Sequence, residues 1–131
     1  MRKLFLIALL ATTFNISSEE TISRWMSDYF KRIHGFIADE NYEKALYELD
    51  MGVNSYFRNG RTYEAALCYQ LYGQYFAVQS QYTDAVPWFE KALATDKMPR
   101  IGMQEVRFQL AQTYFMIGKY KNVISLLEEF I

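Results

Sequence analysis

Three similar six-residue stretches decide the fold: NYEKAL at residues 41–46, QYTDAV at 81–86 and KYKNVI at 119–124. Each has a tyrosine at its second position and a small or β-branched residue three positions later. The tyrosines stand at positions 42, 82 and 120, so the intervals are 40 and 38 residues. A period of this length is typical of antiparallel helix pairs stacked as a solenoid, because a single pair cannot bury its apolar face alone. We expect each tyrosine ring to cover the turn between paired helices, and the small residue to let the helix backbones approach closely.

The chain around these stretches carries helix signals and no period-2 alternation typical of strands. The expected helices cover residues 17–38, 42–58, 61–79, 83–95, 102–117 and 121–131. A capping box formed by Ser17 and Glu20 starts the first, and Thr83 is expected to cap the fourth. Pro87 would then be the fourth residue of its helix, where a proline is tolerated. The breaks are Asn59-Gly60, the segment 96–101 with Pro99, and Gly118. The fold class is therefore all-α, an α-solenoid of antiparallel helix pairs with about six helices after an N-terminal signal-like segment.

The middle repeat has a series of bulky, small and aromatic residues at fixed helix positions. The residues are Tyr69, Tyr72, Gly73 and Phe76, followed by Tyr82, Ala85, Phe89 and Ala92. The third repeat has the same series in Leu110, Ala111, Tyr114, Gly118, Tyr120, Leu127 and Phe130. The first repeat has it in its second helix, through Tyr42, Ala45, Leu49 and Gly52. In this series the chain resembles the tetratricopeptide repeat family, with three departures from the pattern at Ile33, Arg107 and Val123. The intervals also exceed the family's usual ~34 residues, which implies longer helices or loops.

The N-terminus has the order of a secretory signal peptide. Two basic residues, Arg2 and Lys3, precede the apolar run of residues 4–11, and a polar segment follows. The run is too short to cross a bilayer, which takes about 20 residues. We expect a signal peptide at residues 1–18 and a repeat domain at 19–131, with repeats at about 22–57, 62–97 and 102–131. A buried or amphipathic first helix and an uncleaved membrane tether are the alternatives. Export would place the protein in the periplasm or outside the cell.

Composition excludes several classes of function. The formal net charge is -1 and the basic residues are scattered, so no basic stripe for nucleic acid is present. One histidine and one cysteine allow neither a zinc cluster nor an intramolecular disulfide. Cys68 is expected to be a small core residue. No nucleophile motif accompanies His34 and no phosphate-binding loop occurs, so we expect neither an enzyme nor a cofactor or metal site.

The resemblance implies where such a protein binds. In the family, the first helix of each pair lines a concave surface that contacts peptides or partner helices. Carried over to this chain, the partner-binding residues are Leu67, Gln70, Gln74, Ala77, Glu105, Phe108, Gln112 and Phe115, with His34 and Ile37 as counterparts in the first repeat. Glutamine offers both a donor and an acceptor to a peptide backbone, and phenylalanine offers an apolar anchor. The glutamines stand where the family's carboxylate-binding mode has charged residues, so that mode is not expected.

A second surface is expected at the sixth helix, where no polar capping helix follows in the sequence. Its apolar residues are Leu126, Leu127, Phe130 and Ile131. Another copy of the chain, a different subunit or further sequence of a longer protein would cover them. The leading hypothesis is an exported scaffold or assembly factor of an envelope or secretion complex. The alternatives are a cytoplasmic chaperone of the secretion type and a structural subunit that self-associates through this end.

Overall fold

The computed structural model describes residues 24–56, 58 and 62–129. This part of the chain forms the helices α2 (Arg24–Ala38), α3 (Tyr42–Met51), the π-helix η1 (Gly52–Tyr56), α4 (Tyr63–Val78), α5 (Tyr82–Ala94), α6 (Arg100–Met116) and α7 (Tyr120–Glu128). No strand occurs within these residues. The all-α prediction is thereby confirmed. The expected signal peptide at residues 1–18, the Ser17–Glu20 capping box and the Asn59-Gly60 helix stop lie outside the described residues.

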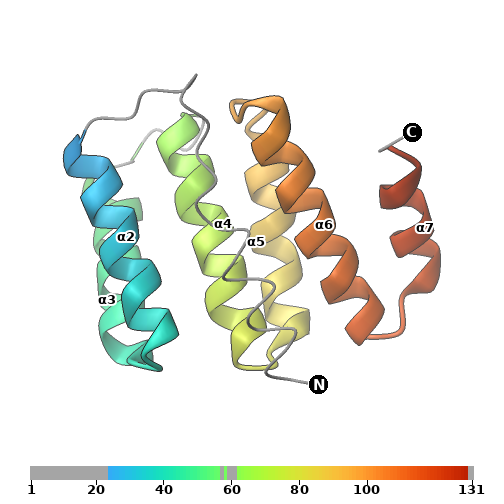
Figure 1. The fold of residues 1–131 in the computed structure, drawn as a ribbon, viewed down its shortest axis with the longest axis horizontal. Coiled ribbons are helices and arrows are strands. Elements are labelled where there is room, and N and C mark those ends of the chain that lie inside the picture. The colour runs from blue at the N-terminus through green and yellow to red at the C-terminus, as the bar shows by residue number, and fades with distance from the viewer. Residues whose placement is uncertain (1–23, 57, 59–61, 130–131) are drawn as a thin grey trace.

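Helices that follow one another in the chain pack together: α2 on α3, α4 on α5, α5 on α6 and α6 on α7. Figure 1 shows α2, α4 and α6 in a front layer, α3 and α5 behind them, and α7 beyond α6. Contacts between α2 and α4 hold the front layer together on one side. On the other side of α4, a hydrogen bond described below connects α4 to α6. The layer formed by α2, α4 and α6 has one side that faces away from α3 and α5. We call this side the front face.

One turn geometry recurs at the three places where the tyrosine stretches begin. Glu40, Ser80 and Gly118 have φ of 60°, 63° and 79°, which is the left-handed region. The next residue in each turn donates its N–H to a carbonyl five positions back: Asn41 to Phe36, Gln81 to Phe76 and Lys119 to Tyr114, at 2.8–2.9 Å. This is the Schellman motif that ends many helices. The sequence repeat thus corresponds to a repeated backbone turn.

The Thr62 side chain accepts a hydrogen bond from the Ala65 N–H at 3.1 Å and caps α4, as its position at the helix start requires.

The start of α5 corrects two sequence expectations, the capping role of Thr83 and the position of Pro87 in the helix. Thr83, expected to cap α5, lies inside that helix instead, and Gln81 holds the cap position without a side-chain bond. Pro87 is consequently the sixth helical residue rather than the fourth. Because proline has no N–H, the carbonyl of Thr83 loses its partner within the helix.

The core lies where the predicted repeat residues meet. Phe89 on α5 packs against Gly73 on α4, at a point where a β-carbon on residue 73 would lie 2.5 Å from the ring. Tyr72 stacks on Trp88 with ring centroids 4.1 Å apart, and its hydroxyl donates to the Asp50 carboxylate. Cys68 is buried, and burial together with the nearby Asp50 raises the pKa of its thiol to about 12. The thiol therefore stays protonated at neutral pH, as a core residue does.

Candidate functional site

The predicted partner-binding residues divide into a buried half and an exposed half on the front face. The four α4 residues Leu67, Gln70, Gln74 and Ala77 are all buried, contrary to the exposure expected of a free binding surface. On α6, Phe108 and Phe115 are 43% and 59% exposed. Glu105 and Gln112 are half-buried. In α2, His34 is half-buried and Ile37 is buried.

One hydrogen bond joins the faces of α4 and α6 that carry four glutamines, and we call these four the amide cluster: Gln70, Gln74, Gln109 and Gln112. The Gln70 Nε2 donates to the Gln109 Oε1 at 2.9 Å, which joins the two helices through a buried bond. Gln74 lies one turn after Gln70, and Gln112 lies one turn after Gln109, so each pair shares a helix face. Gln109 was not among the residues predicted from the sequence. Its position 39 residues after Gln70, close to one repeat, is the signal that could have identified it.

Gln74 is the unusual member of the amide cluster. It is completely buried, and neither its Nε2 nor its Oε1 has a hydrogen-bond partner among the described residues. The Oε1 of Gln112 is buried and unpartnered as well. Leaving a buried polar group unpaired costs about 1–3 kcal/mol, so such groups are rare in native proteins. A primary amide offers both a donor and an acceptor, which matches the two polar groups of a peptide bond.

Replacing Gln74 by leucine tests this cost directly. We expect Gln74→Leu to raise the free energy of unfolding by about 1–3 kcal/mol, because it removes two unpaired buried polar atoms at similar volume. Gln109→Leu is the matched control, and it should lower that free energy because it leaves the Gln70 amide without its partner. Urea unfolding followed by circular dichroism measures both. A Gln74→Leu protein less stable than the parent would show that the amide is paired in solution.

Glu105 adds a titratable group to the same helix face as Phe108 and Gln112. Burial raises the pKa of its carboxyl from 4.5 to about 7. Because the raised value belongs to the folded state, the folded protein holds this proton more tightly than the unfolded chain. The contribution of Glu105 to stability is thus fully present below pH 4.5, falls as the pH rises to 7, and is lost above it.

This linkage gives a pH prediction. The free energy of unfolding of the parent protein, measured relative to a Glu105→Gln variant, should decrease between pH 4.5 and 7 and be constant above pH 7. Urea unfolding of both proteins at pH 4, 5.5, 7 and 8 measures the difference. A difference that does not change with pH would contradict the burial of this carboxyl.

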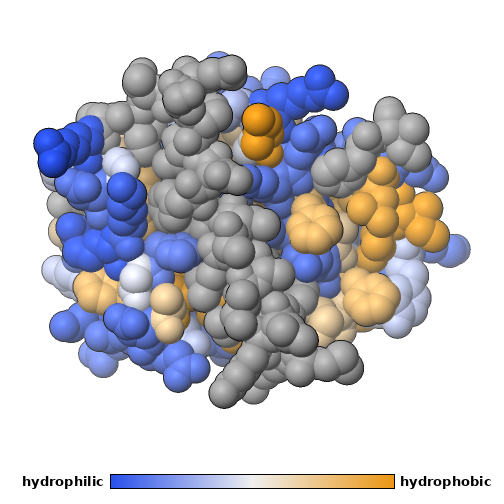
Figure 2. Space-filling model, in the orientation of Figure 1, coloured by the Kyte–Doolittle hydropathy of each residue, from blue (hydrophilic) through white to orange (hydrophobic). Residues whose placement is uncertain are grey.

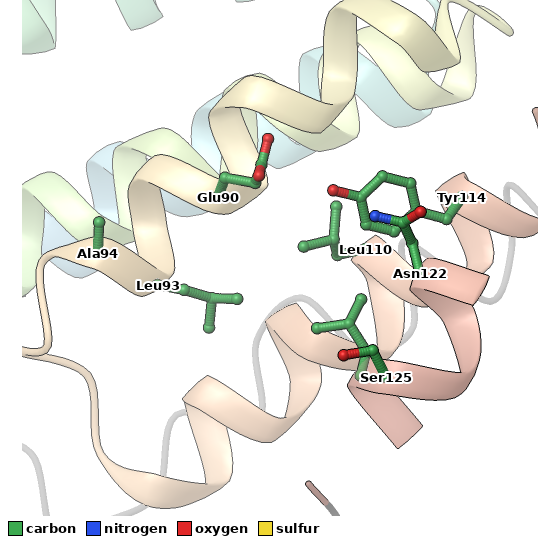
Figure 3. Close-up of a pocket in the computed structure, with 8 residues that line it drawn as sticks. Glu90, Leu93, Ala94, Leu110, Tyr114, Asn122 and Ser125 are labelled. Atoms are coloured by element: carbon green, nitrogen blue, oxygen red, sulfur yellow. The ribbon is translucent and has the colours of Figure 1, made fainter. Parts of the chain in front are cut away.

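A second concave region lies on the other side of α6. The groove has a volume of about 410 Å³ and is lined by α5, α6 and α7. Figure 3 shows Glu90 and Leu93 of α5 across from Tyr114 and Leu110 of α6, with Asn122 and Ser125 of α7 beside them. Burial, and next the Glu90 charge, raise the pKa of Tyr114, while hydrogen bonding to Asn122 opposes the shift. The phenol therefore remains neutral and joins the three helices through polar contacts.

Within residues 24–56, 58 and 62–129, no three His, Cys, Asp or Glu side chains are placed to hold a metal ion. None of the helices in this part of the chain is long and apolar enough to cross a bilayer. Comparison with protein-family models, with curated proteins and with solved structures finds no match for this chain.

Proposed function

We propose that this chain is a non-enzymatic protein-interaction module that binds a partner polypeptide on its front face. The observation that supports this most is the exposure of two phenylalanine rings on one side of α6. The exposed Phe108 and Phe115 lie seven residues apart on α6, where they offer apolar anchors beside the amides.

The architecture that goes with this proposal is an α-solenoid of antiparallel helix pairs resembling tetratricopeptide repeats. The recurrent Schellman turns at Glu40, Ser80 and Gly118 support it, because they follow the same 40- and 38-residue spacing as the tyrosines. In such a stack the front face formed by α2, α4 and α6 is the concave side. On that side the α4 residues are buried, and the exposed α6 residues Phe108 and Phe115 are the ones free to bind a partner.

We propose that the module is exported and acts as a scaffold or assembly factor of an envelope or secretion complex. The signal-like order of residues 1–18 supports export. Mass spectrometry of the protein from its native cells tests this part separately. A mature N-terminus within residues 12–19 is expected, whereas a soluble cytoplasmic protein that begins at Met1 would favour the chaperone alternative.

The binding proposal is tested by a crosslinked pull-down from native cells. The parent protein is compared with the double variant Phe108→Ala, Phe115→Ala, whose replaced side chains are exposed and contribute little to folding. Tyr47→Ala on α3 is the control, since its ring is also exposed and lies outside the front face. We expect one partner to be captured by the parent and the control and lost by the double variant. Equal capture by all three would exclude the front face as the site.

A further inference from the structure

The groove between α5, α6 and α7 has a counterpart one repeat earlier, between α3, α4 and α5. The three recurrent turns show which residues correspond, because their hydrogen bonds end at the carbonyls of Phe36, Phe76 and Tyr114. Residues of α3 therefore correspond to residues of α5 that stand 40 positions later. Residues of α4 and α5 correspond to residues of α6 and α7 that stand 38 positions later.

A side-chain contact supports this alignment independently of the turns. The Lys91 ammonium lies over the Tyr69 ring, 4.8 Å from its centroid. The counterparts of these two residues, Glu129 and Arg107, form an ion pair at 2.8 Å. The same two positions are thus in contact in both repeats, although the chemistry of the contact differs. Other aligned positions can be compared in the same way.

Two aromatic rings fill the space between α3, α4 and α5. Tyr72 of α4 stacks on Trp88 of α5, with the ring centroids 4.1 Å apart and an angle of 14° between the rings. The Tyr72 hydroxyl donates a hydrogen bond to the Asp50 carboxylate of α3. A single phenol therefore contacts the helices on both sides of α4.

The later groove keeps the acidic residue but has smaller side chains in place of both rings. All three counterparts line the groove of about 410 Å³. Figure 3 shows the carboxylate on α5 across from the leucine of α6. The counterparts are Leu110 for Tyr72, Leu126 for Trp88 and Glu90 for Asp50. The groove is thus open where the earlier one holds a phenol and an indole.

Glu90 can accept a hydrogen bond from a ligand in this groove. It is exposed and forms no ion pair with the described residues. A carboxylate has two oxygens with about four acceptor sites, so the Tyr114 phenol beside it leaves room for another donor. Leu110 is buried and Leu126 is half-buried, and they provide apolar surface for a ring.

The eleven tyrosines of the chain do not supply such a ring. All of them lie in the helices α2 to α7 and η1, and among the residues that line the groove only Tyr114 is a tyrosine. Tyr114 corresponds to Phe76 rather than to Tyr72, so it holds a different position in the groove.

We propose that this groove binds a tyrosine side chain of a partner polypeptide, whose phenol takes the place that Tyr72 has one repeat earlier. The ring packs between Leu110 and Leu126, and its hydroxyl donates to the Glu90 carboxylate. Asn122 and Ser125 are exposed along the α7 side of the groove, where their amide and hydroxyl can bond to the partner's backbone.

This site is separate from the front face. Figure 2 views the molecule from the front face, with apolar side chains gathered at the right over α6 and α7, whereas the groove lies on the other side of α6. The proposal therefore goes beyond the proposed function, since it gives the module a second site.

The test uses the full chain and two blocked alanine pentapeptides with tyrosine or phenylalanine at the centre. Amide chemical shifts should change saturably at Glu90 and Leu126. The tyrosine peptide should bind about tenfold more tightly, which is the ratio that a hydrogen bond to a charged group contributes. Glu90→Leu should abolish this preference, while Glu43→Leu, at an exposed position on α3, should leave it unchanged.

A second variant, Leu126→Trp, places an indole in the groove as Trp88 does one repeat earlier. It should weaken the binding of both peptides by about tenfold or more, because the ring fills the space that the ligand needs. It also shows whether the groove itself is the site, since it leaves the Glu90 carboxylate in place.

Three results would overturn the proposal. One is the absence of saturable shifts at the groove, and another is a tyrosine preference that persists in Glu90→Leu. The third is a dimer of the parent in sedimentation that Leu126→Trp converts to monomer, since a second copy would then occupy the groove. The outcome is independent of the front face, because neither Phe108 nor Phe115 is altered.

Discussion

Replacing Phe89 by alanine lowers the free energy of unfolding by about 3–5 kcal/mol, among the largest effects expected of a single truncation in the described part of the chain. The ring is completely buried between α4 and α5, and it fills the space that Gly73 leaves open. Alanine removes the apolar area and leaves a cavity that the two helices cannot close. A small domain has a total stability of about 5–15 kcal/mol, so the variant should be near the limit of folding.

Urea unfolding monitored by circular dichroism measures this loss. Tyr47→Ala serves as the control, because its ring is 64% exposed and should change the free energy of unfolding by less than about 0.5 kcal/mol. A Phe89→Ala protein within about 1 kcal/mol of the parent would mean that α4 and α5 do not pack on this ring.

Gly73→Ala has the second largest expected effect, a loss of about 1–3 kcal/mol. An added β-carbon would lie 2.5, 2.6 and 2.8 Å from three ring atoms of Phe89, closer than carbon atoms can approach. The helices must therefore move apart, even though alanine is the better helix former. The same substitution at Gly35 in α2 meets nothing within 4 Å, so it should instead stabilise the protein by about 0.5–1 kcal/mol.

A double-mutant cycle assigns the Gly73 effect to the ring. If the contact with Phe89 is the cause, Gly73→Ala should cost less in a Phe89→Leu background, because the smaller side chain leaves room for the new methyl group. Additive losses in the double variant, or a stabilising Gly73→Ala in the parent, would show that the two helices are not in close contact here.

The tyrosine stretches, together with the expected caps and breaks, predicted the all-α fold of the described residues and most of the helix boundaries there. They did not reveal the cause of the recurrent turn. Glu40, Ser80 and Gly118 all adopt the left-handed conformation that favours glycine. Since only the last of them is a glycine, only that turn could be predicted from the sequence. The start of α5 was predicted wrongly for the same reason. Thr83 is a residue type that often caps helices, but after the turn at Ser80 the cap position falls on Gln81, two residues earlier. Tertiary packing, rather than local propensity, fixed these positions.

The candidate site was predicted in part. The resemblance to tetratricopeptide repeats assigned Gln70, Gln74 and Gln112 to one surface, and the structure places Gln70 beside α6 through Gln109. Spacing could not reveal that the α4 residues are buried, because burial depends on what packs over a helix. Nor could it separate the Gln74 amide, which has no partner, from the Gln70 amide, which has one. Both facts required the structure.

The most direct test of the front-face claim is site-specific photo-crosslinking in native cells. A photoreactive phenylalanine analogue is placed at Phe108 in one protein and at Tyr47 in another, since both positions are exposed and aromatic. The account predicts that the Phe108 probe crosslinks to one distinct polypeptide, that a Phe115→Ala change weakens this product, and that the Tyr47 probe does not form it. The same product from both positions, or crosslinks to other copies of this chain alone, would contradict binding of a partner on the front face.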